Sequence, residues 1–169
     1  MPPRVSALAP LREKIFRRVW VANQISSFGG LVQGVGAAWM MTSLTTSASL
    51  IALVQASMTL PIMLFSISAG ALADSYDRRA LMLVAQVFML TASIALTVTA
   101  MAGWLTPWSL LGFTFLIGMG TALNNPAFQA GLGDFVPREI LPEAVSLNSI
   151  GFNLMRSVVP AIGGIIVAT

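Results

Sequence analysis

The stretch "GALADSYDRRA", residues 70–80, decides the fold, because it places a short charged turn between two long apolar runs. Four charged side chains fall within residues 74–79, in a chain that has only nine basic and six acidic residues. The runs before and after the turn are long enough to cross a bilayer as helices. The pattern is typical of two membrane-spanning helices that are joined at the membrane surface.

The composition of the whole chain points to the same environment. Hydrophobic residues make up 56% of the 169 residues, and charged residues make up 9%. A soluble domain carries about 25% charged residues, so the surface of this protein is suited to lipid rather than to water. Lipid offers backbone groups no hydrogen-bond partners, and the chain has no alternating strand pattern. We therefore predict an all-α integral membrane protein.

The chain contains no cysteine and no histidine, which excludes disulfides, thiol chemistry and Cys/His metal sites. No pair of carboxylates lies within an apolar run, so an intramembrane enzyme has little support. We therefore expect a protein that is not an enzyme, with no catalytic residue, no metal ligand and no cofactor.

Five apolar segments are long enough to span a membrane at a rise of about 1.5 Å per residue. They cover approximately residues 19–41, 50–73, 80–101, 108–132 and 144–168. Residues 1–18 form a basic segment before the first span. We therefore divide the chain into this amino-terminal segment and a transmembrane helical domain over 19–169, which we expect to be incomplete.

Basic residues are concentrated at the amino terminus and in the second and fourth connections, 74–79 and 133–143. The connections 42–49 and 103–107 carry no charge. The positive-inside rule then predicts a multi-pass protein of the cell membrane with a cytoplasmic amino terminus. A basic patch can also bind nucleic acid, but no aromatic interleaving or polar fold accompanies this one, so we expect no nucleic-acid partner.

The charged turn must reverse the chain within about six residues. Asp77 is a candidate for the left-handed backbone region, which aspartate tolerates better than most residues. Asp74 can cap the following helix and accept a hydrogen bond from Arg78. A generic positive-inside loop is the alternative interpretation of the same residues.

Small residues recur along the first and fourth spans and indicate close helix packing. In the first span they stand four positions apart at Ser26, Gly30 and Gly34. In the fourth span they are Gly112, Gly118 and Gly120.

At this turn the sequence resembles the major facilitator superfamily, whose loop between helices two and three has the pattern Gly-x-x-x-Asp-(Arg/Lys)-x-Gly-Arg-(Arg/Lys). The positions that match the pattern are Gly70, Asp74, Arg78 and Arg79. Ser75 replaces a usual basic residue, and Asp77 replaces a usual glycine. The resemblance implies that the matching residues form a gating loop on the cytoplasmic side.

Residues 124–164 resemble the same family, in the exporter group that includes enterobactin exporters and macrolide-efflux proteins. Their tail "PAIGG" matches the Pro-x-x-Gly-Gly end of the fifth-helix antiporter motif, so Pro160, Gly163 and Gly164 are expected to serve helix packing. Val159 stands where that motif has a glycine.

The resemblance implies a fold of twelve helices in two six-helix halves. This chain corresponds to most of the amino-terminal half, and its partners would be a carboxyl-terminal half in cis or in trans, the lipid bilayer and a small organic solute. The implied activity is secondary active transport by alternating access, directed outward as in an antiporter of a bacterial inner membrane. Protons are one candidate coupling ion.

Arg156 is the most informative polar residue within a predicted span. It lies about twelve residues, or roughly 18 Å, into the fifth span, where a charge that faces lipid costs at least about 2.5–3.5 kcal/mol. With Asn148 at 0°, a helix places Arg156 at about 80° and Asn153 at about 140°. The three side chains therefore share a face, directed either toward a cavity or toward the carbonyls of neighbouring helices.

Two further amides complete the predicted substrate path. Gln33 lies at about the depth of Arg156 in the first span, and Asn124 lies toward the cytoplasmic end of the fourth. The resemblance places the first, fourth and fifth helices around the path. Amides in a membrane can instead hold helices together, and that alternative stays open for both residues.

No Asp or Glu lies deep in a predicted span, so a carboxylate for proton coupling would have to lie elsewhere in a complete transporter. A second hypothesis is a truncated, non-transporting membrane module that acts by helix–helix association or homo-oligomerisation. The ending "GGIIVAT", without a polar tail, favours a truncated transporter over a finished module.

Overall fold

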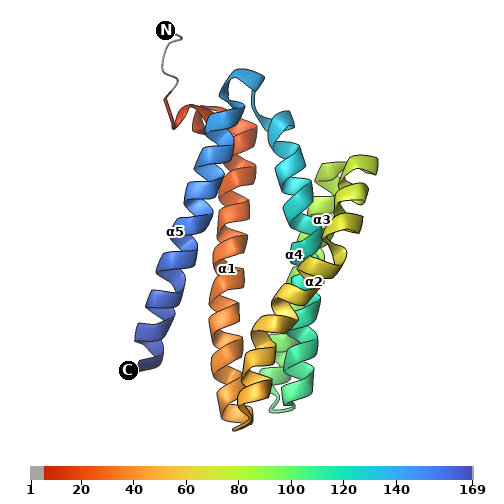
Figure 1. The fold of residues 1–169 in the computed structure, drawn as a ribbon, viewed down its shortest axis with the longest axis vertical. Coiled ribbons are helices and arrows are strands. Elements are labelled where there is room, and N and C mark those ends of the chain that lie inside the picture. The colour runs from red at the N-terminus through yellow and green to blue at the C-terminus, as the bar shows by residue number, and fades with distance from the viewer. Residues whose placement is uncertain (1–5, 169) are drawn as a thin grey trace. The chain divides into compact units, whose positions relative to one another are not determined.

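The computed structural model describes residues 6–168, and it describes side-chain surroundings as far as Pro160. Within this range the regular structure is helical (Figure 1). The elements are the 3-10 helices η1 (Ala9–Arg12) and η2 (Arg138–Ile140), and the α-helices α1 (Lys14–Leu44), α2 (Ala48–Ser75), α3 (Arg78–Met101), α4 (Pro107–Phe135) and α5 (Leu141–Ala168). Each predicted apolar segment is confirmed as a helix, and each of these helices extends beyond the predicted span at one end or both.

Within the described residues, α2 and α3 are long and apolar enough, by length and composition, to cross a membrane. These are the two helices that flank the charged turn. The count of five membrane spans stays a prediction.

The chain divides into two compact units. One unit contains Met1–Val35 together with Gly131–Thr169, and the other contains Gly36–Ala130. Helix α1 contributes its first part to the former unit and its last part to the latter.

The unit of residues 36–130 has an apolar core to which α1, α2, α3 and α4 all contribute. Its buried members are Ala37, Met41, Val54, Ala92, Leu96, Leu110, Leu111 and Ile117. Gly118 and Gly120 bring α4 close to its neighbours, since a Cβ atom at Gly118 would lie 2.5 Å from the carbonyl oxygen of Met58 and one at Gly120 would overlap the side chain of Met89. The packing predicted for these two glycines is confirmed.

The small residues that sequence spacing grouped together do not all pack closely. A Cβ atom at Gly112 or at Gly30 would meet no neighbouring atom within 4 Å in the described chain. The prediction of close packing is therefore wrong for Gly112 within its unit. The spacing of small residues in the sequence shows which face of a helix they share. Close packing also requires that another helix lies against that face.

In the unit that contains residues 6–35 and 131–168, α5 lies beside the first part of α1. Phe16 is fully buried and its ring stacks on Trp20 with the centroids 6.4 Å apart. Gly151 of α5 faces Gln24 and the indole of Trp20, so that the absence of a side chain allows the two helices to approach.

The α2–α3 turn is built differently from the expectation. Asp77 is the N-cap of α3, and its Oδ1 accepts a hydrogen bond from the backbone N–H of Arg79 at 2.9 Å. Its φ is −60° and its ψ is 114°, so the expected left-handed conformation is wrong. Asp74 belongs to the last turn of α2, so the expected capping by Asp74 is also wrong. Extended backbone at Tyr76 and Asp77 reverses the chain without a positive φ.

We expect Asp77→Ala to lower the stability of the folded protein by about 1 kcal/mol, because the backbone N–H of Arg79, in the first turn of α3, loses its acceptor. Thermal unfolding of the purified protein would measure the change. Asp74→Ala is the matched control, because Asp74 is exposed and caps no helix start in the described chain. Equal losses for both variants would contradict the assignment of the cap.

Candidate functional site

The charged turn is tied to the end of α4 through Arg78. The guanidinium Nη1 of Arg78 donates a hydrogen bond to the carbonyl oxygen of Ala130 at 2.9 Å, and the side chain is half-buried. Asp74 and Arg79 are exposed, and Gly70 is half-buried with nothing within 4 Å of the position of a Cβ atom. Arg78 therefore orients the turn, while Asp74 and Arg79 are presented at its surface.

Asn124 lies where α3 and α4 meet. Its exposed fraction is 5%, and its Oδ1 accepts a hydrogen bond from Nε2 of Gln86 at 3.3 Å. This geometry supports the interpretation that the amide of Asn124 holds two helices together. Sequence reasoning did not include Gln86, although an amide in an otherwise apolar span was a usable signal.

The polar face of α5 divides into two parts. Arg156 is exposed, and its guanidinium carbon lies 5.8 Å from the ring centroid of Phe152, within cation–π range. Asn153 is exposed and its Nδ2 donates a hydrogen bond to the carbonyl oxygen of Ser149 at 2.9 Å. Asn148 is half-buried, and its Oδ1 is buried without a hydrogen-bond partner. Arg156 and Asn153 thus share an accessible surface, and Asn148 is turned inward.

The remaining predicted residues lie on α1 and near the end of α5. Those on α1 are half-buried: Ser26, Gly30, Gln33 and Gly34. Pro160 is exposed within α5. The surroundings of Gly163 and Gly164 lie outside the described side chains, so their role in packing stays a prediction.

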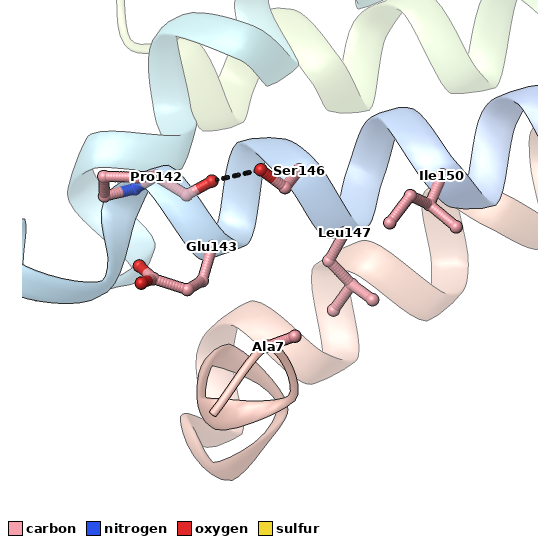
Figure 2. A pocket seen from close by; sticks show the side chains of 6 residues that line it. All are labelled: Ala7, Pro142, Glu143, Ser146, Leu147 and Ile150. Carbon is pink, nitrogen blue, oxygen red and sulfur yellow. Dashed lines mark hydrogen bonds between the residues drawn. The ribbon is translucent and has the colours of Figure 1, made fainter. Parts of the chain in front are cut away.

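A pocket of about 220 Å³ lies between the amino-terminal segment and the start of α5 (Figure 2). Its lining consists of Ala7, Pro142, Glu143, Ser146, Leu147 and Ile150. The hydroxyl of Ser146 donates a hydrogen bond to the carbonyl oxygen of Pro142 at 2.8 Å, and Oε2 of Glu143 is buried without a partner. Sequence reasoning had placed Glu143 only at the cytoplasmic edge, because nothing in the pattern indicated that it would line a pocket together with Ala7.

The chain is similar to bacterial transporters. It is 32% identical over 147 residues to the staphyloferrin A transporter of Staphylococcus aureus (strain NCTC 8325 / PS 47), an alignment that covers 83% of this chain and 36% of the relative. It is 24% identical to macrolide efflux protein A of Streptococcus pyogenes, over 89% of this chain and 37% of the relative. It is 28% identical to macrolide efflux protein A of Enterococcus faecalis, over 63% and 33% respectively.

The chain spans about a third of the length of these curated relatives. No solved structure gave a significant match to it. The family described as "transmembrane secretion effector" (MFS_3) matches residues 5–169, and the relatives are transporters rather than enzymes. This confirms the resemblance of the charged turn and of residues 124–164, and the chain belongs to the transmembrane secretion effector family of major facilitator proteins.

Proposed function

We propose that this chain is the amino-terminal part of a secondary transporter that exports a small organic solute by alternating access. The observation that carries the proposal is the family match over residues 5–169, together with relatives named as a staphyloferrin A transporter and as macrolide efflux proteins. A carboxyl-terminal half would complete the path, and the protein would lie in the bacterial cell membrane.

Within this proposal, Arg156 and Asn153 form the polar surface that meets the solute. Both are exposed on α5, and the guanidinium of Arg156 lies over the ring of Phe152. An arginine offers five N–H donors in a planar fork, a geometry that matches a carboxylate or another anionic group. Gln33 would add a hydrogen bond to the solute, whereas Asn124 would act by joining α3 to α4. Asn148, whose Oδ1 is buried, would not face the solute.

The experiment that tests the function compares cells that express the protein from its own gene with cells that lack it. A macrolide and staphyloferrin A, taken from the names of the relatives, are the first two probes. We expect expression to lower the cellular content of at least one probe, and collapse of the membrane potential and proton gradient to remove the difference. The same comparison can be extended to a panel of anionic and amphiphilic solutes. If the two kinds of cells contain equal amounts of every probe, the result would instead favour the non-transporting module.

The orientation can be tested with single cysteines, because the sequence contains none. Ser75→Cys in the charged turn should react with a membrane-impermeant maleimide only after the cells are permeabilised. Ala102→Cys, in the uncharged connection after α3, should react in intact cells. Both residues are exposed in the described chain, so accessibility depends on the side of the membrane. The reverse result would place the amino terminus outside.

We expect Asp74→Asn to slow turnover more than it weakens solute binding, because the proposed gating loop would lose a negative charge while Asp77 still caps α3. Transport rates measured against solute concentration would separate the two effects. A stability equal to that of the unsubstituted protein is the internal control. A turnover number that does not change would reduce the loop to an orientation signal.

A further inference from the structure

Four buried side-chain atoms lack a hydrogen-bond partner in the described part of the unit that contains residues 6–35 and 131–168. One is Oε2 of Glu143, at the pocket described above, and the other three belong to residues on α1 and α5. They are Nε1 of Trp20 and Oε1 of Gln24 on α1, and Oδ1 of Asn148 on α5. Gln24 is only 6% exposed, so solvent at the protein surface does not reach its amide. A buried polar atom without a partner costs about 1–3 kcal/mol, and three such atoms together need an explanation.

Two of the three side chains, those of Trp20 and Gln24, face Gly151. A Cβ atom at Gly151 would overlap Nε2 of Gln24 and would lie 3.2 Å from Cζ2 of Trp20, the ring carbon next to the one that carries Nε1. Trp20 and Gln24 are four residues apart and therefore lie on one face of α1. Asn148 precedes Gly151 by three residues and therefore lies on the same face of α5. The three unpartnered atoms thus belong to neighbouring side chains at one contact between α1 and α5.

The hydrogen-bonding capacity of these atoms determines which kind of group can pair with all three. The indole of Trp20 can only donate, whereas the two amide oxygens can only accept. A group that accepts one hydrogen bond and donates two completes the set. A water molecule does this with one lone pair and both of its hydrogens, and buried waters typically make about three hydrogen bonds. An alcohol has one hydroxyl hydrogen and would leave one amide oxygen without a donor.

We propose that Trp20, Gln24 and Asn148 form a binding site for one internal water molecule, which links α1 to α5 beside Gly151. The site is independent of the transported solute. It explains how this helix contact accommodates three polar groups, and it makes the glycine at 151 a requirement for the position of the Gln24 amide.

The direct test is nuclear magnetic resonance of the protein expressed from its own gene, labelled with ¹⁵N in the tryptophan indoles. The sample contains no added solute and a phosphocholine detergent without hydroxyl groups, so neither a solute nor the detergent can supply a hydroxyl group to the site. Trp20→Phe identifies the signal of Trp20. We expect the indole N–H of Trp20 to show cross-relaxation with water and slow hydrogen exchange. The indole of Trp108, which is 70% exposed, should exchange rapidly and serves as the reference.

The glycine provides a matched pair of variants. Gly151→Ala should displace the Gln24 amide and remove the water cross-relaxation of Trp20, whereas Gly29→Ala, with nothing within 4 Å of its Cβ position on α1, should leave it unchanged. The indole N–H of Trp20 could instead have a chemical shift typical of a hydrogen bond but show no cross-relaxation with water. That result would show a direct hydrogen bond to an amide oxygen and would overturn the proposal. An indole N–H of Trp20 that shows neither a hydrogen bond nor cross-relaxation with water would overturn it as well.

Thermal unfolding supplies a second readout that does not depend on the spectra. Gln24→Met and Asn148→Leu should each lower the Tm, because each leaves one hydrogen of the water without an acceptor. The triple variant that also carries Trp20→Phe should lose less than the sum of the single losses, because no polar group then remains to need the water. Losses that simply add would contradict a shared water.

Discussion

Arg156→Ala is expected to lower the transport rate by about 10- to 100-fold, with the protein still present in the membrane at its normal amount. The guanidinium is exposed on α5, so its removal leaves no buried partner unsatisfied and should not disturb folding. A hydrogen bond to a charged group contributes about 1.5–3 kcal/mol, which corresponds to this range of rates when the bond is made to the solute. Solute efflux from loaded cells or liposomes measures the loss.

Two variants separate a solute-binding role from a general effect of charge. Arg138→Ala removes another exposed arginine, in η2, and should leave the rate within about twofold of normal if surface charge is unimportant there. Arg156→Lys keeps the positive charge but loses the planar fork, so we expect only partial recovery. Normal efflux by Arg156→Ala would remove this residue from the proposed path.

Gly118→Ala is expected to destabilise the protein by about 1–3 kcal/mol, which is a decrease in Tm of several degrees for a chain of this size. The added methyl group would lie 2.5 Å from the carbonyl oxygen of Met58 and 3.0 Å from Cγ of Pro61, and backbone atoms cannot move aside as a flexible side chain can. Helices α2 and α4 would have to separate. Thermal unfolding of the purified protein gives the measurement.

The same helix provides the control for this prediction. Gly112→Ala lies six residues earlier on α4 and would meet nothing within 4 Å. It should be neutral or stabilising, because alanine favours a helix over glycine by up to about 1 kcal/mol. Equal decreases for the two variants would show that general effects of glycine substitution, and not the contact with Met58, control the stability of α4.

The sequence was sufficient to locate the charged turn, but it did not indicate the contacts that the turn makes. The pattern Gly-x-x-x-Asp in residues 70–74 marked the turn, and the structure has a helix on each side of it. The pattern did not indicate which acid caps α3, because both Asp74 and Asp77 stand near the helix start. The partner of Arg78, the carbonyl oxygen of Ala130, lies 52 residues away and left no trace in the local sequence.

The sequence by itself determined that this is a helical chain suited to lipid and that it resembles the major facilitator superfamily. Those conclusions depend on composition, on the length of apolar runs and on local motifs. All three can be obtained from the sequence without knowing which helices are in contact. Only the tertiary structure decided which glycines bring helices together, that Asn124 meets Gln86, and that Oδ1 of Asn148 is buried while Arg156 stays exposed. The physical reason is that helical spacing gives the face on which a side chain lies, whereas its partner depends on which other helix packs against that face.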